Sequence, residues 1–162
     1  MKRLTREEKF MRAAIKIAQK GLSEGEVPIG AVVVYEDKVV ARGYNRRARL
    51  QLASAHAEMM AIDKACKKFG SWRLPEGCEL YVTLEPCPMC AGAAINARLE
   101  RVVYGAHDLR FGALGSLFDL SAMPLNHKLE VTPAVMGEEC ASILTEYFRR
   151  KRKKKDNSDM LS

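Results

Sequence analysis

Residues 78–97 read CELYVTLEPCPMCAGAAINA. Their first seven residues form a nearly continuous apolar run of strand length, as expected for a β-strand that is covered on both faces. A stretch of small residues begins near Pro88, and proline is favoured at the first position of a helix. The segment therefore predicts a buried strand over 78–84 that leads within a few residues into a helix over about 88–97.

Helices and strands alternate on both sides of this segment. Thr5 and Glu8 have the spacing of a capping box, which marks the start of a helix. The expected apolar face of that helix consists of Phe10, Ala14, Ile17 and Ala18. Further strands are expected over 29–35, 39–45, 101–105 and within 128–135, and a polar loop over 46–54. Further helices are expected over 56–69 and from about residue 138 into the basic residues near the C-terminus. This alternation predicts an α/β fold of three layers, in which a mixed sheet, antiparallel at its first hairpin, carries helices on both faces.

Length and composition favour one compact domain. A chain of 162 residues with 48% apolar content is long enough to bury a sizeable core without disulfide bonds. The longest apolar stretch, residues 27–35, is far shorter than the roughly 20 residues of a membrane-spanning helix, so no membrane association is expected. The charged N-terminal residues lack the apolar centre of a secretory signal. Five cysteines, an odd number, favour a reducing cytoplasmic compartment with metal-binding or redox cysteines.

The positive charge of the chain is concentrated in one place. The formal net charge is +7, and residues 149–155 read RRKRKKK. Without these seven cations the chain holds 20 basic and 20 acidic residues, so the rest of the protein is neutral overall. Such a run can bind a polyanion such as RNA, but it can also be a solvated tail.

Two short motifs carry side chains suited to metal chemistry. Residues 56–58 read HAE and residues 86–90 read PCPMC, and each motif begins an expected helix. Zinc accepts imidazole nitrogen and thiolate sulfur, and three protein ligands with one open position are typical of a catalytic site. His56, Cys87 and Cys90 supply three such ligands. Glu58 is then close enough to take a proton from water at the metal.

Other interpretations of these residues remain open. The two cysteines of the motif can be a redox pair or two buried thiols, and a histidine at a helix start is often a cap. A structural zinc site needs a fourth ligand, for which the candidates are Cys66, Cys78, Cys140, His107 and His127. The three cysteines among them fall on apolar helix faces or in a buried strand, which indicates core positions. The two motifs together favour catalytic zinc over structural zinc.

The combination H-x-E followed by P-C-x-x-C is the signature of zinc-dependent nucleobase deaminases. Over roughly residues 5–150 the sequence closely resembles the bacterial tRNA-specific adenosine deaminases. The resemblance is carried by EVPIGA (26–31), GYN (43–45), AHAE (55–58), TLEPCPMCAG (83–92), GAHD (105–108) and GALGS (112–116). Asn45 and the loop that contains the last two of these segments point to the tRNA branch. The chain departs from the family at 51–54, where a Pro-containing turn is common, and at Leu109 and Phe111, which are bulkier than expected.

The resemblance implies a cytidine-deaminase-like fold and assigns roles to individual residues. One zinc ion per subunit would be bound by His56, Cys87 and Cys90, while Glu58 would move protons. Contacts to the flipped-out nucleotide and the surrounding RNA would come from Asn45, the Ala57 backbone amide, Asp108, Phe148 and Arg149. On their own, Asn45 can equally end a strand and Asp108 can stabilise a turn.

The implied activity is the hydrolytic deamination of the wobble adenosine of a tRNA anticodon to inosine, in the cytoplasm. Residues 1–150 would form the deaminase domain, and 151–162 a basic extension of the last helix with a tail. The resemblance also implies the anticodon stem-loop of tRNA as a partner and a homodimer. One alternative is a deaminase of free nucleosides, nucleotides or bases such as cytidine or guanine, although the basic C-terminus favours RNA. Another is a zinc-stabilised RNA-binding module without catalysis.

Overall fold

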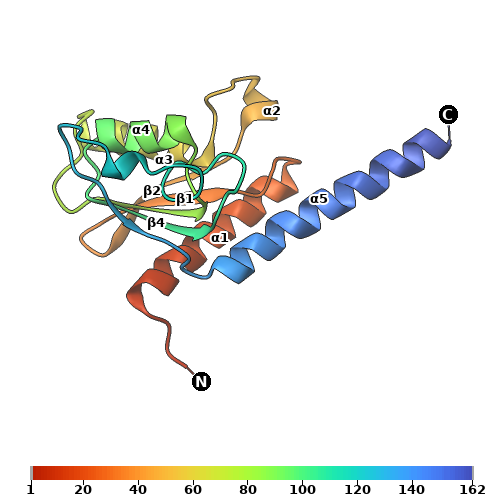
Figure 1. Cartoon of the computed structure of the whole chain (residues 1–162), viewed down its shortest axis with the longest axis horizontal. Coiled ribbons are helices and arrows are strands. Elements are labelled where there is room, and N and C mark those ends of the chain that lie inside the picture. Colours follow the sequence, from red (N-terminus) through yellow and green to blue (C-terminus); the bar gives the residue numbers. More distant parts are fainter. Residues whose placement is uncertain (1, 162) are drawn as a thin grey trace.

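The computed structural model describes residues 2–161 and contains a central five-stranded sheet (Figure 1). The strands are β1 (Gly30–Tyr35), β2 (Lys38–Tyr44), β3 (Glu79–Leu84), β4 (Arg101–Ala106) and β5 (Glu130–Thr132), in the order β2-β1-β3-β4-β5. β1 runs antiparallel to both β2 and β3, whereas β3, β4 and β5 run parallel to one another. The sheet is mixed, as predicted, and its antiparallel part extends beyond the first hairpin to the β1–β3 pair.

Helices cover both faces of this sheet (Figure 1). They are α1 (Arg6–Ser23), α2 (Arg47–Leu50), α3 (Ala57–Phe69), α4 (Pro88–Asn96) and α5 (Gly137–Met160), with a 3-10 helix η1 (Leu120–Ala122). α1 and α5 lie on one face, and α3 and α4 lie on the other. Alternate side chains of β1 point to opposite faces of the sheet. Val33 packs in the core beneath α3, whereas Val32 and Val34 pack in the core beneath α1. The predicted three-layer α/β fold is therefore confirmed.

α1 begins as the sequence predicts. The Glu8 N–H donates to Thr5 Oγ1 at 3.1 Å, and the Thr5 N–H donates to the Glu8 carboxylate at 2.9 Å. The predicted buried face was incomplete, because Met11 and Ile15 are also buried while Ile17 is only partly so. The sheet covers a wider stripe of this helix than the predicted one.

The polar segment 46–54, predicted as a loop, contains the short helix α2. The backbone N–H groups of Ala48 and Arg49 in its first turn donate to the buried carboxylate of Glu26 at 3.4 and 2.7 Å. These N–H groups have no partner within the helix, so a side chain from a distant part of the chain stabilises its start. Such a contact leaves no local signal in the sequence.

The start of α3 lies directly against β2 because Gly43 has no side chain. A Cβ on Gly43 would lie 2.4 Å from the carbonyl oxygen of Ala57 and 2.5 Å from the backbone nitrogen of Ala61. Glycine permits this close approach of two backbones. The contact brings the first turn of α3 next to Asn45, which directly follows β2.

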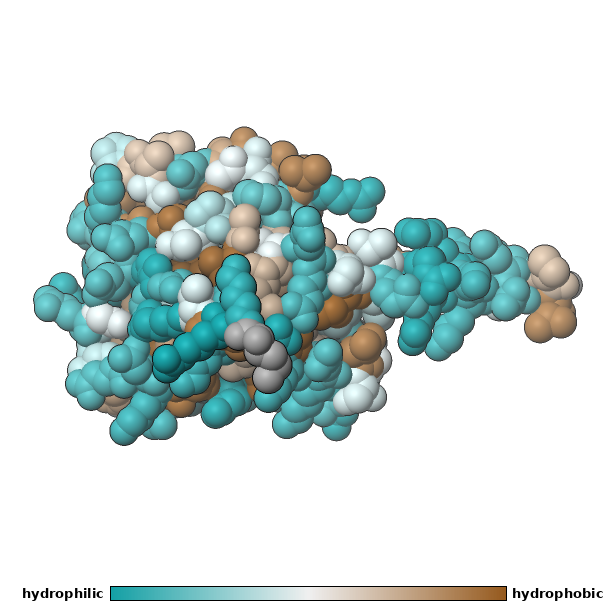
Figure 2. All heavy atoms as spheres, turned by 90° about the horizontal axis from the view of Figure 1, so that it is seen from below, coloured by the Kyte–Doolittle hydropathy of each residue, from teal (hydrophilic) through white to brown (hydrophobic). Residues whose placement is uncertain are grey.

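α5 continues past the body of the protein (Figures 1 and 2). It includes the whole basic run 149–155 and ends at Met160, so most of the expected C-terminal tail is helical. Residues 151–160 are all exposed, and Figure 2 shows a hydrophilic surface along the projecting part up to its apolar tip. In the described part of the chain, no helix combines the length and the apolar character needed to cross a membrane.

Candidate active site

The two sequence motifs meet at the N-termini of α3 and α4. His56 is the N-cap residue of α3, and Glu58 lies in the first turn of that helix. Cys87 is the N-cap residue of α4, Pro88 occupies the first turn as predicted, and Cys90 follows within the same turn. Helix N-termini carry partial positive charge, which favours thiolates and carboxylates at these positions.

The donor atoms of His56, Cys87 and Cys90, here called the donor group, have the spacing that zinc requires. His56 Nδ1 lies 3.6 Å from Cys87 Sγ and 3.5 Å from Cys90 Sγ, and all three donor atoms lie within 4.8 Å of one another. A tetrahedral zinc ion with bonds of about 2.0–2.1 Å to nitrogen and about 2.3 Å to sulfur would separate these donors by about 3.6 Å. The residues therefore fit one zinc ion.

The other candidate ligands lie elsewhere. Within residues 2–161, no further His, Cys, Asp or Glu joins the donor group. Cys78 and Cys140 are buried in the two cores, as expected, whereas Cys66 is only partly buried. The rings of His107 and His127 lie within hydrogen-bond distance of the Tyr104 hydroxyl and the Leu99 carbonyl oxygen. A donor group of three members leaves one tetrahedral position open, which distinguishes a catalytic site from a structural one.

Burial and mutual hydrogen bonds change the acidity of the side chains at the donor group. The pKa of Cys87 is lowered to about 4, chiefly by the hydrogen bond with Cys90 and also by His56. The same hydrogen bond, together with burial, raises the pKa of Cys90. Burial raises the pKa of Glu58 to about 7.

A cavity of about 1070 Å³ lies beside the donor group. Its lining includes His56, Glu58 and Cys87, together with side chains from the segments 25–29, 45–53 and 107–111 and from α5. Of the predicted substrate contacts, Asn45, Ala57, Asp108 and Phe148 all line this cavity. Arg149 does not belong to the lining and pairs with Glu146 at 2.8 Å on the helix surface.

Asn45 is buried at the end of β2. Its backbone N–H donates to the Ile29 carbonyl oxygen at 3.3 Å, and its side-chain Nδ2 donates to the Glu26 carboxylate at 3.4 Å. Glu26 thus orients the Asn45 amide and also stabilises the start of α2. The residue has both a structural partner and a position on the cavity wall.

Asp108 stabilises a turn in the loop 107–116. Its Oδ1 accepts from the backbone N–H groups of Arg110 and Phe111, both at 3.0 Å. This is the hydrogen-bond pattern of an Asp-stabilised turn, which matches the structural alternative for the residue. The turn holds Leu109 and Phe111 at the cavity with exposures of 79% and 64%.

Glu85 is a buried residue that the sequence interpretation did not single out. Its carboxylate accepts from the backbone N–H groups of Asp108, Leu114 and Ser116, each at 3.1 Å, and from the Ser116 hydroxyl. Burial alone would raise the pKa of Glu85, but these hydrogen bonds lower it below the ordinary value. Glu85 therefore connects the zinc-binding motif to the loop 107–116. Its place directly before that motif was the only available signal.

Three cations lie on the cavity wall: Arg47, Arg110 and Lys151. The sequence interpretation did not single out Arg47 and Arg110, and it included Lys151 only as a member of the basic run 149–155. Lys151 continues the helical spacing of Leu144, Tyr147 and Phe148, and its Nζ lies 5.8 Å from the centre of the Tyr147 ring. That spacing was the signal that could have identified it.

The fold and the donor group define the class of zinc-dependent nucleobase deaminases. The family model described as the cytidine and deoxycytidylate deaminase zinc-binding region matches residues 4–106. The chain is 51% identical over 153 residues to the tRNA-specific adenosine deaminase of Bacillus subtilis (strain 168), covering 94% of each chain. It is 41% identical over 151 residues to the enzyme of that name from Haemophilus influenzae, covering 92% of this chain and 87% of the relative. The chain belongs to the family of tRNA-specific adenosine deaminases.

Solved structures agree with this assignment. One comes from a study of A-to-I editing by tRNA:A34 deaminases at the wobble position of transfer RNA. It matches with a TM-score of 0.80 and 43% identity, and the match covers 84% of this chain and 99% of that chain. A guanine deaminase from Nitrosomonas europaea matches with a TM-score of 0.71 and 27% identity over 86% of this chain and 83% of that chain. The protein is thus an enzyme with the cytidine-deaminase-like fold, and its family binds zinc.

Proposed function

We propose that this enzyme converts the wobble adenosine of a tRNA anticodon to inosine by hydrolytic deamination. The observation that carries the proposal is the donor group with one open position, which lies beside a cavity whose wall carries Arg47, Arg110 and Lys151. A nucleobase can enter the cavity while the cations attract the RNA backbone. Relatives named as tRNA-specific adenosine deaminases support the same substrate.

His56, Cys87 and Cys90 would hold the zinc ion through Nδ1 and the two thiolates. Bound zinc supplies Lewis acidity, which makes water a competent nucleophile at neutral pH. Glu58 is the general acid–base group, because it is buried, lines the cavity and follows His56 by two residues. It accepts a proton as water adds to C6 of adenine and delivers that proton to N1. It then transfers the proton of the new C6 hydroxyl to the amino group, which leaves as ammonia while the C6 carbonyl of inosine forms.

The walls of the cavity would hold the flipped-out nucleotide. Asn45 and the Ala57 backbone amide would contact the base or its ribose, and Asp108 would line the anticodon pocket. An adenine that is paired and stacked cannot enter such a pocket, so a splayed anticodon loop is a suitable substrate. Phe148 would contact the RNA from α5, whereas contact by Arg149 requires that its ion pair with Glu146 opens.

The test is to incubate the purified protein with total tRNA and to sequence for adenosine read as guanosine. We expect the change at the wobble position and poor turnover of free adenosine, cytidine and guanine, because remote RNA contacts position the base. Comparable kcat/KM on a free base or nucleoside would instead favour the small-molecule alternative.

We also propose a homodimer. Within the described residues, the segment 117–125 exposes Leu117, Phe118, Met123 and Leu125 to between 41% and 58%. Adjacent exposed apolar side chains of this kind are typical of a protein interface. Analytical ultracentrifugation should give a dimer for the wild-type protein and a monomer for Phe118→Asp; a monomeric wild-type protein would refute the proposal.

The remaining proposals concern domain organisation and compartment. We propose that residues 1–150 form the deaminase domain and that 151–162 are a basic extension of α5 and its tail. We propose a cytoplasmic location, which suits five free cysteines and a tRNA substrate. Fractionation of cells that express the protein, followed by immunodetection, tests the location.

A further inference from the structure

The cations in the outer part of α5 lie on different faces of the helix. Lys151 is the last residue of α5 on the cavity wall. At about 100° per residue, Lys154 and Lys155 are rotated by only about 60° and 40° from Lys151, in opposite directions. Both are exposed. Lys151, Lys154 and Lys155, here called the cavity-side stripe, therefore continue the face that lines the cavity.

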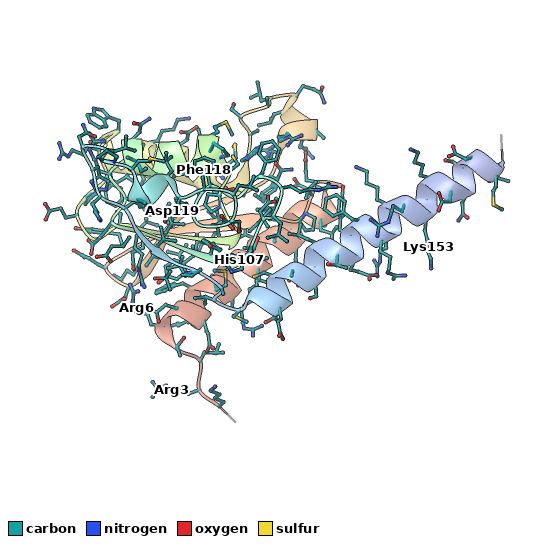
Figure 3. All side chains as sticks on the ribbon, in the orientation of Figure 1. Arg3, Arg6, His107, Phe118, Asp119 and Lys153 are labelled. Carbon is teal, nitrogen blue, oxygen red and sulfur yellow. The ribbon has the colours of Figure 1, made fainter. Side chains whose placement is uncertain are left out.

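The other cations of the run are placed differently. Arg149 and Arg150 each pair with the Glu146 carboxylate at 2.8 Å. Lys153 is rotated by about 200° from Lys151, and Figure 3 shows it on the side of α5 that faces away from α2. The run thus distributes cations around the whole helix, but only the cavity-side stripe continues the face that lines the cavity.

The accessible charges on the cavity wall are also positive. The carboxylates of Glu26, Glu58 and Glu85 are buried, and that of Asp108 hydrogen bonds to the backbone of its own loop. The remaining charged side chains of the wall, apart from its histidines, are Arg47, Arg110 and Lys151. A polyanion that enters the cavity therefore meets positive charge at the rim and along the cavity-side stripe.

We propose that the cavity-side stripe binds backbone phosphates of the RNA outside the nucleotides held in the cavity, an inference that rests on the proposed function. With a rise of about 1.5 Å per residue, Lys155 lies about 6 Å beyond Lys151 and about 16 Å beyond Leu144 along the helix axis. Leu144 is the innermost α5 residue of the cavity wall. The stripe is thus placed to reach the stem while the loop occupies the cavity.

The chemistry of the helix favours RNA over a membrane surface. Residues 149–159 contain no apolar side chain. A helix that binds in a membrane interface needs an apolar face to insert, which this segment lacks. Exposed lysines on a rigid helix, by contrast, neutralise phosphates without insertion.

The experiment compares two double variants that each remove two positive charges. Lys154→Gln with Lys155→Gln changes the stripe. Arg152→Gln with Lys153→Gln is the control of equal charge, since these residues are rotated by about 100° and 200° from Lys151. Binding of an anticodon stem-loop RNA is measured at several salt concentrations. The stripe variant should bind more weakly, with a salt slope smaller by about 1.4–1.8, because each phosphate contact contributes about 0.7–0.9 to that slope. The control should retain the wild-type affinity and slope. Glutamine is a good helix former, and circular dichroism verifies that α5 is intact in both variants.

Two further measurements make the result decisive. On a loop-only oligonucleotide the stripe variant should bind as the wild-type protein does, because no stem is present for the stripe to contact. Equal losses in both variants, no loss in either, or the same deficit on the loop-only RNA would each overturn the proposal. Wobble deamination by the wild-type protein is assayed in parallel. Its absence refutes the proposed function, whereas equal salt slopes with intact deamination refute only the stripe.

Discussion

The donor group and the rim of the cavity are built in different ways. His56, Cys87 and Cys90 occupy the first turns of two helices, so each position follows from the way its own helix begins. The rim segments 45–53 and 107–111 receive their shape from elsewhere, through the buried carboxylates of Glu26 and Glu85. Local helix starts therefore present the metal ligands, which meet because α3 packs beside α4, whereas hydrogen bonds to buried carboxylates shape the substrate-facing walls.

The comparisons cover these two parts of the molecule differently. The family model that matches residues 4–106 contains the whole donor group but ends before the loop that Glu85 holds. A guanine deaminase shares the fold at 27% identity. Substitutions in the donor group should therefore abolish the reaction, and substitutions in the rim should change substrate binding with the metal retained.

The largest effect is expected from Glu58→Ala. General acid–base groups contribute about 10²–10⁴-fold, and a group that acts in several proton transfers should reach the upper end of that range. Turnover of an anticodon stem-loop should fall accordingly, while zinc content, measured by atomic absorption, stays at the wild-type level. Near-normal turnover in a variant with stoichiometric zinc would show that Glu58 is not the proton-transfer group.

Cys87→Ser and Cys90→Ser should each weaken zinc binding. Because metal binding stabilises the native state by mass action, both variants should also have a lower Tm than the wild-type protein, as should wild type treated with a chelator. Cys66→Ser and Cys140→Ser are the controls, since neither residue belongs to the donor group. Loss of zinc from either control would mean that the ligand set is wrong.

A smaller effect is expected on the rim from Asn45→Ala. Removal of a buried polar partner costs about 1–3 kcal/mol, or roughly 5- to 150-fold in kcat/KM on the stem-loop. Zinc content should not change. If the variant retained full kcat/KM on the stem-loop, the role of Asn45 would be limited to its hydrogen bonds with Glu26 and Ile29.

The smallest effects on catalysis are expected from the two residues that support the rim, because their loss acts on stability. Glu85→Gln replaces a carboxylate, which accepts from several backbone N–H groups, by an amide with one acceptor oxygen. Buried donors are then left unpaired, which lowers the free energy of unfolding by about 1–3 kcal/mol. The Tm should fall by about 2–4 °C for each kcal/mol, with zinc retained. Glu26→Gln is the matched change at the other wall and should give a similar shift. Loss of zinc from Glu85→Gln would show that the loop and the donor group are not independent.

The sequence by itself predicted the three-layer fold, the strand at 78–84, the helix starts at Thr5 and Pro88, and the three donors that the structure brings together. The strand and the helix starts depend on residues close together in the chain, namely an apolar run, a capping pair and a proline at a helix start. The fold followed from the alternation of such elements, and the three donors followed from the combination of two local motifs. Only the tertiary structure revealed α2, the support of the rim by Glu26 and Glu85, and the presence of Lys151 rather than Arg149 on the cavity wall. The two glutamates act on residues about 20 to 30 positions further along the chain, and the phase of α5 against the cavity is set by packing on the sheet. Contacts of this range are created when the chain folds, so no local pattern records them.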